Sequence, residues 1–168
     1  ETLVILGGSG SGKSVLLRHT IGLMAPDRGR VRVESTDLTG LSEEDLVPVR
    51  KKGGMLFQGG ALFDSMDVFE NVAYALREHS DLGEEEIASR VRQKLELVEL
   101  DPSVETLMTS DLSGGMRKRV ALARAIALDP RGILYDEPTT GLDPITAHAI
   151  NLMIRSLQRT LNVTSVVV

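Results

Sequence analysis

The sequence has no cysteine, and its three histidines are scattered at positions 19, 79 and 148. Without cysteine, neither a disulfide framework nor a thiolate metal site is possible, and the scattered histidines predict no metal cluster. Positive charge is also in short supply, because the formal net charge is −5. This balance argues against an extended surface that follows nucleic-acid phosphates. We therefore expect no nucleic-acid partner.

Long apolar runs are also missing. No stretch approaches the roughly 20 apolar residues that a bilayer-spanning helix needs, and no signal peptide opens the chain. We expect a soluble, cytosolic protein that reaches a membrane only through a partner.

Both ends of the 168-residue chain fall in apolar strand patterns. Leu3–Leu6 lies almost at the start, and the β-branched run Val163–Val168 ends the chain without a turn or cap. Such a run is typical of a buried parallel strand. We expect the chain to be a piece of a larger domain, truncated on both sides.

Glycine is concentrated in Gly7–Ser14, which reads G-G-S-G-S-G-K-S. An apolar strand pattern precedes it and a helical pattern follows, which is the context of a P-loop. Glycines let successive backbone N–H groups turn inward around phosphate oxygens, and the helix N-terminus adds its positive dipole end. Lys13 would reach the β- and γ-phosphates, and Ser14 would ligate Mg²⁺. The stretch predicts nucleotide phosphate binding.

Apolar periodicity and capping residues predict the other elements. They are strands at 30–34, 55–57 and 133–135, and helices at 13–23, 42–47, 67–79, 84–100, 113–128 and 143–161. Alternating strands and helices predict a mostly parallel sheet covered on both faces.

Two carboxylates, Asp136 and Glu137, end the apolar strand Ile133–Tyr135. Carboxylates often cap strands, so the pair alone is weak evidence. In a chain that already holds a P-loop, we favour a functional interpretation. Asp136 would hold the Mg²⁺ shell, and Glu137 would act as general base toward the attacking water.

The helix start at Ser113 is unusual, because two glycines and three cations, Arg117–Arg119, follow it. Glycines cost about 1 kcal/mol each in a helix relative to alanine. Cations in the first turn oppose the helix dipole. One interpretation is a capped surface helix with solvated arginines. We favour an approaching anion, and a nucleotide shared between two chains.

Together these pieces resemble the nucleotide-binding domain of ATP-binding cassette (ABC) proteins. The matching motifs, in the family's order, are Gly7–Ser14 as Walker A, Gln58 as the Q-loop glutamine, Leu112–Met116 as the signature, Ile133–Glu137 as Walker B and Gly141–Asp143 as the D-loop. The resemblance implies an α/β P-loop NTPase (RecA-like) core with an inserted α-helical subdomain. Residues 1–66 and 116–168 would form the ATPase core, and 67–115 the helical subdomain with the signature at its end.

The resemblance also implies the site. Glu137, Lys13 and Gln58 would be catalytic, and Ser14, Gln58 and Asp136 would hold or sense Mg²⁺. The residues expected to bind ATP are Gly7, Ser9, Gly10, Ser11, Gly12, Lys13, Ser14, Val15, Ser113, Gly114, Gly115 and Asp143.

The family's architecture implies a head-to-tail dimer with two ATPs at the interface. Each Walker A would face Ser113 and Gly114 of the second copy, and Asp143 would link the two sites. Gln58 would pass closure to an integral-membrane permease that docks near the helical insert. The chain would then sit at the cytoplasmic face of the inner membrane.

The chain departs from the family at Met116, where the signature usually ends in glutamine. The aromatic residue that usually stacks on adenine and the switch histidine lie outside the sequence. The stretches 55–63 and 68–74, together with Met116, resemble one branch that contains the ATPases of Mla phospholipid transport and of Mce-type lipid transporters. In that branch a methionine-ended signature is usual. The aromatic cluster after Gln58 would face the permease or support its groove.

Two other functions stay open. The first is an ABC transporter ATPase for another substrate, such as amino acids or metals. The second is a soluble ABC ATPase in DNA repair or translation. Such soluble proteins usually carry long coiled-coil insertions, and the stretch between Gln58 and Leu112 is too short for one.

Overall fold

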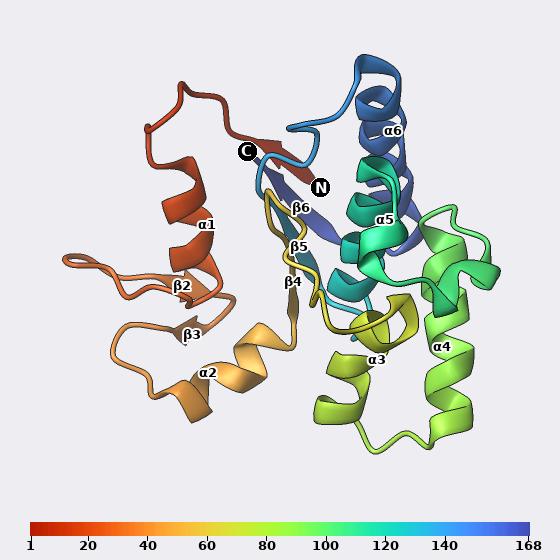
Figure 1. Cartoon of the computed structure of the whole chain (residues 1–168). Coiled ribbons are helices and arrows are strands. Elements are labelled where there is room, and N and C mark those ends of the chain that lie inside the picture. The colour runs from red at the N-terminus through yellow and green to blue at the C-terminus, as the bar shows by residue number, and fades with distance from the viewer.

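The computed structural model describes residues 1–168 and is built around a four-stranded sheet (Figure 1). The strand order is β1 (Thr2–Val4), β6 (Thr164–Val167), β5 (Gly132–Tyr135) and β4 (Gly53–Leu56), and every neighbouring pair is parallel. The final β-branched run therefore forms a parallel strand, as predicted. A separate hairpin joins β2 (Arg32–Val33) to β3 (Thr36–Asp37).

The two faces of the sheet are covered by different helices, because successive side chains of a strand point to opposite faces. Met55 and Leu134 pack with Leu17 and Ile21 beside α1 (Lys13–Thr20). The neighbouring strand residues face the larger core on the other side. The helices of that side are α3 (Val68–His79), α4 (Glu84–Leu97), α5 (Gly114–Ala125) and α6 (Pro144–Thr160). The prediction of a parallel sheet with helices on both faces is confirmed.

The helix starts follow from local capping. Asp67, Ser113 and Asp143 each accept a backbone N–H of the first turn of α3, α5 and α6. Two 3₁₀ turns, η1 (Pro102–Thr106) and η2 (Thr109–Asp111), lead from α4 to α5. The division of the chain into an ATPase core and a helical subdomain at 67–115 stays a prediction.

Some predicted boundaries are wrong. The helix α2 (Glu43–Arg50) does not stop before Pro48 but continues through it. Pro48 removes one hydrogen bond to Glu44, whose exposed position lets water replace it. The predicted strand 30–34 is shorter, because Glu34 adopts a left-handed φ of 53° and turns the chain into β3. The helix predicted over 84–100 ends at Leu97, just before the left-handed Glu99.

Candidate functional site

The glycine loop connects the end of β1 to the start of α1. Gly10 and Gly12 adopt φ values of 77° and 91°, which glycine tolerates at little cost. The Lys13 ammonium donates to the carbonyl oxygens of Gly7 at 3.0 Å and Gly8 at 3.1 Å. A Cβ at Gly7 would lie 2.7 Å from the Ser11 hydroxyl, so a side chain there would crowd the inside of the loop. This backbone forms a cradle that fits phosphate oxygens.

Two hard oxygen ligands meet beside this loop. The Ser14 hydroxyl donates to a carboxylate oxygen of Asp136 at 2.6 Å. Asp136 is only 3% exposed at the end of β5, and its N–H donates to the carbonyl of Leu56. No group of three or more His, Cys, Asp or Glu side chains forms a metal cage. Two protein oxygens beside a phosphate cradle fit Mg²⁺, which usually takes few protein ligands and completes its shell with phosphate and water.

Glu137 is held in a strained backbone conformation, with φ at 45°. Its carboxylate accepts hydrogen bonds from the Gln58 amide and the Thr140 hydroxyl, each at 2.9 Å. Its N–H donates to the carbonyl of Val168. Such strain in a non-glycine residue is often kept at functional sites. Thr140 was not among the predicted site residues, and only its position three residues after Glu137 signals its role.

Lys118 reaches the same site from α5. Its side chain is buried, and its ammonium donates to the Gln58 carbonyl. Burial lowers the pKa of Lys118, while the nearby carboxylates of Asp136 and Glu137 act in the opposite direction. Two of the three cations at 117–119 are therefore paired within the chain, and the prediction of an anion at Ser113 and the glycine amides stays a prediction. Lys118 binds the Q-loop, and Arg119 binds the carbonyl of Val98 and the carboxylate of Glu99.

The start of α5 lies apart from the glycine loop. Helices α1 and α5 lie on opposite sides of the sheet (Figure 1), and no hydrogen bond joins residues 113–115 to residues 7–14. The Ser113 hydroxyl accepts the Met116 N–H at 3.2 Å and is exposed. A Cβ at Gly115 would lie 2.8 Å from the Thr146 methyl group, so glycine allows α5 to approach α6 closely. The chain thus brings the two Walker motifs and Gln58 together and leaves the signature elsewhere.

Asp143 caps α6. One of its carboxylate oxygens accepts the N–H groups of Ile145 and Thr146, each at 3.0 Å. The side-chain and backbone hydrogen bonds from Thr146 are the largest causes that lower the pKa of this carboxyl group. It lies at the exposed start of the helix and has no contact with the glycine loop.

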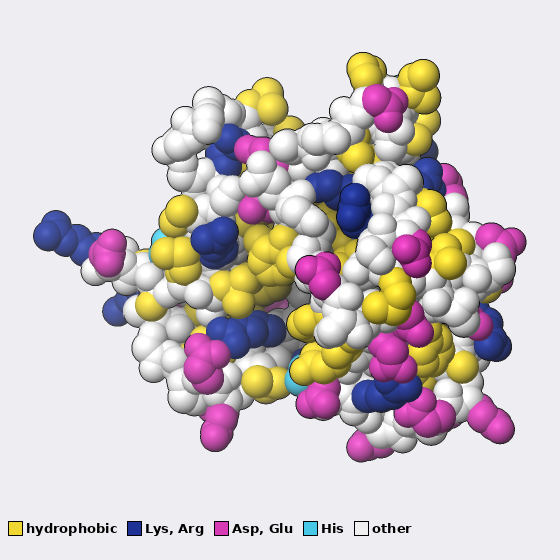
Figure 2. Space-filling model, in the orientation of Figure 1, with side chains coloured by type: hydrophobic (Ala, Val, Ile, Leu, Met, Phe, Trp, Pro, Cys, Tyr) yellow, Lys and Arg dark blue, Asp and Glu magenta, His cyan; other side chains and the backbone are white.

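The aromatic cluster predicted after Gln58 is divided between two environments. Phe57 and Phe69 pack against the two cores. Phe63 and Tyr74 are exposed, and their ring centroids lie 5.2 Å apart. They line an apolar groove of about 390 Å³ that Leu23 also contacts. In Figure 2, hydrophobic side chains gather in the hollow near the centre of the view.

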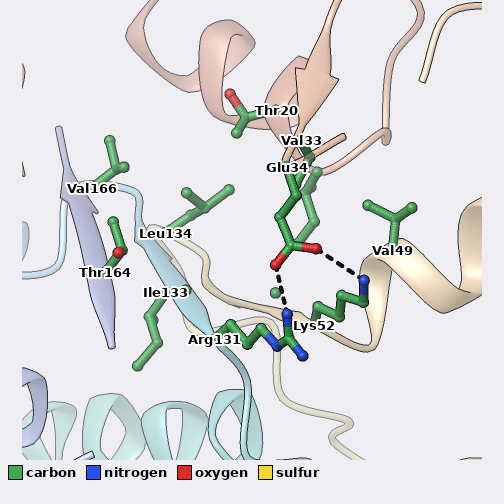
Figure 3. A pocket seen from close by; sticks show the side chains of 13 residues that line it. Thr20, Val33, Glu34, Val49, Lys52, Arg131, Ile133, Leu134, Thr164 and Val166 are labelled. Atoms are coloured by element: carbon green, nitrogen blue, oxygen red, sulfur yellow. Dashed lines mark hydrogen bonds and ion pairs between the residues drawn. The ribbon is translucent and has the colours of Figure 1, made fainter. Parts of the chain in front are cut away.

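A second cavity, of about 320 Å³, lies at the amino ends of β4 and β5, away from Asp136 (Figure 3). Glu34 accepts from Lys52 at 3.0 Å and from Arg131 at 2.9 Å across its mouth. Hydrogen bonds from these two cations lower the pKa of the Glu34 carboxyl group, and the bond from Lys52 has the larger effect. The ion cluster fastens the β2–β3 hairpin to the sheet, and none of the predicted site residues lines this cavity.

The known proteins that the chain resembles in sequence are named as ATP-binding proteins of transport systems. The chain is 49% identical over 164 residues to the intermembrane phospholipid transport system ATP-binding protein MlaF of Haemophilus influenzae, covering 98% of the chain and 62% of that protein. It is 44% identical over its whole length to the probable ribonucleotide transport ATP-binding protein mkl of Mycobacterium leprae, covering 48% of that protein. The chain therefore spans between about half and three fifths of the length of these relatives.

The fold agrees with solved structures of the same kind. A dimeric structure of the ATP-binding cassette MJ0796 in a post-hydrolysis state, bound to ADP and Pi, matches with a TM-score of 0.90 and 34% identity. The match covers 99% of this chain and 73% of that one. CbiO1 from Clostridium perfringens, described as part of the ABC transporter complex cbiONQ, matches with a TM-score of 0.87 and 31% identity, covering 99% of this chain and 66% of that one.

The family model described as ABC transporter matches residues 1–140. This match spans the glycine loop, Gln58, the signature and both Walker B carboxylates. The resemblance drawn from these motifs is confirmed. The chain belongs to the ABC transporter family.

Proposed function

We propose that the full-length protein binds and hydrolyses ATP and powers a membrane permease that transports phospholipid. The observation that carries the ATPase part is the meeting of three segments at one point. Ser14, the last residue of the glycine loop, donates to Asp136, and Gln58 donates to the carboxylate of Glu137.

The proposed chemistry assigns one step to each group. The glycine-loop N–H groups and Lys13 bind the phosphates and neutralise charge on the transferred γ-phosphoryl group. Glu137 takes a proton from a water molecule while the oxygen of that water attacks the γ-phosphorus. The bond from the γ-phosphorus to the bridging oxygen breaks, and ADP is released. Bound Mg²⁺ would be held by Ser14 and Asp136, sensed by Gln58, and would withdraw charge from the phosphate oxygens.

Ser113, Gly114 and Gly115 complete the site from a second copy of the chain in this proposal. Ser113 and Gly114 are exposed, and none of the three residues bonds to the chain's own glycine loop, which supports a site shared between two chains. The likeness to a dimeric cassette bound to ADP and Pi supports the same assembly. Asp143, at the exposed start of α6, would then link the two sites.

The permease would dock on the apolar groove lined by Phe63 and Tyr74. None of the helices described is both long and apolar enough to cross a bilayer. We propose that the protein acts at the cytoplasmic face of the inner membrane, bound peripherally through this permease. No nucleic-acid partner is proposed.

The names of the relatives favour two cargoes. The relatives at 49% identity are named for intermembrane phospholipid transport, and those at 44% for ribonucleotide transport. The sequence around Gln58 and the methionine-ended signature favour phospholipid as the transported cargo. Ribonucleotide is the second candidate.

The test is to purify the full-length protein with its membrane subunits and to identify the bound cargo by mass spectrometry. We expect phospholipid to be enriched over the same protein purified without its permease. Enrichment of ribonucleotides would replace the lipid proposal and leave the ATPase proposal standing. Failure to recover any membrane subunit would contradict the transport role itself.

A further inference from the structure

Two cations of α5 hold the segment that follows β4. The Lys118 ammonium donates to the Gln58 carbonyl. One guanidinium nitrogen of Arg124 donates to the Ala61 carbonyl at 2.7 Å, and the other donates to the Gly60 carbonyl at 2.8 Å. The Arg124 guanidinium also lies 5.5 Å from the centre of the Phe63 ring. We call residues 58–63 with these two cations the loop clamp.

Forming the contacts of the loop clamp removes water from two cations, and losing these contacts would leave the cations without acceptors. Burial lowers the pKa of both Lys118 and Arg124, because the charged forms lose hydration. Lys118 is buried and Arg124 is half-buried, so both cations need strong acceptors in place of water, and three carbonyls of one short loop serve as these acceptors. The loop itself is tightly bent, since Gly60 and Ala61 have φ values of 81° and 51°. Without the two cations, nothing else in α5 would satisfy these carbonyls.

The loop and the helix carry residues that serve different nucleotides in the proposed dimer. The loop carries Gln58, whose amide donates to Glu137 in the chain's own site. The helix begins at Ser113, which would face the nucleotide of the second copy. The loop also runs close to α5, because a Cβ added at Gly60 would lie only 3.4 Å from the Ala121 methyl group.

We propose that Lys118 and Arg124 are positioning residues that make the loop and α5 move as one body. When Ser113 closes on the second copy's nucleotide, the loop clamp then sets Gln58 against Glu137 in the chain's own site. This inference rests on the proposed ATPase function and adds a physical link between its two sites.

The test compares K118M and R124M with the wild-type full-length protein in complex with its permease. Methionine keeps an unbranched apolar stem and removes the cation. Because misplacing catalytic groups by about 1 Å can cost roughly 10²-fold, we expect kcat to fall at least about tenfold. The affinity of the uncomplexed subunit for ATP should stay unchanged, since the glycine loop is untouched. Amide hydrogen exchange at residues 58–63 should become faster in both variants.

Two controls separate positioning from general destabilisation. K118R restores a cation at the Gln58 carbonyl and should recover most of kcat. R119M removes another cation of α5, which binds the Val98 carbonyl and none of the loop carbonyls. It should lower the melting temperature without changing kcat or exchange at 58–63. If one methionine variant fails to fold, the other carries the test.

Wild-type kcat and exchange rates in folded K118M and R124M would overturn the loop clamp, as would an equal loss of kcat in R119M. Absence of ATP hydrolysis in the wild-type protein would instead overturn the proposed function.

Discussion

Replacing Glu137 with glutamine in the full-length protein is expected to lower ATP hydrolysis by roughly 10²- to 10⁴-fold, the usual contribution of a general base. Glutamine cannot take the proton of the attacking water. Its amide oxygen can still accept from Gln58 and Thr140, which now hold the carboxylate at 2.9 Å. The geometry of the site should therefore survive. ATP binding should continue while turnover stops, so an ATP-bound dimer should accumulate.

Phosphate release measures the turnover, and light scattering with ATP and Mg²⁺ measures the dimer. Glu99→Gln is the matched control, because Glu99 pairs with Arg119 on the surface, away from the site. This control should keep the parental rate. Parental turnover in E137Q would show that Glu137 is not the general base.

Substituting alanine for Gly54 is expected to cost about 3 kcal/mol or more of stability, at the upper end for overpacked cores. An added Cβ would lie 2.3 Å from the Ala125 carbonyl oxygen and 3.1 Å from its carbonyl carbon. Both atoms are backbone, so no side-chain rotation relieves the clash. Helix α5 would have to move off β4, and this contact supports the sheet face that carries Ile133 and Tyr135.

Urea denaturation of the full-length protein measures this loss. Gly59→Ala is the control, because an added Cβ there meets no atom within 4 Å and Gly59 has no positive φ. Its free energy of unfolding should stay close to that of the parent. Equal stability of G54A and G59A would show that β4 and α5 do not pack as described.

The parts of the fold that could be predicted depend on neighbours in sequence. Ser42, Ser113 and Asp143 were predicted as helix caps because a cap bonds to an N–H two or three residues away. The glycine loop was recognisable for the same reason, since its spacing and its flanking strand and helix are contiguous. The parallel sheet followed from the alternation of strand and helix.

The parts that could not be predicted depend on the tertiary arrangement. The Ser14–Asp136 bond joins residues 122 positions apart, and only the presence of both Walker A and Walker B motifs indicated that they would meet. Nothing near Lys118 in the sequence shows that it turns inward to a carbonyl 60 positions away. Arg124 binds carbonyls more than 60 positions away in the same manner. The course of α2 through Pro48 was missed because water can replace the lost bond at an exposed turn.

The central claim is that the nucleotide site is shared between two copies of the chain, and mixing two inactive variants tests it most directly. Lys13→Ala disables the glycine loop, and Ser113→Arg blocks the signature. In a two-fold symmetric dimer either variant alone has both sites defective. A mixed dimer of the full-length proteins contains one intact site, made from the loop of one chain and the signature of the other.

We expect ATP hydrolysis to recover on mixing to about one quarter of the wild-type rate, since half the dimers are mixed and each holds one intact site. If each chain carried a complete site of its own, mixing would restore nothing. Hydrolysis that stays at the level of the separate variants would contradict the shared site.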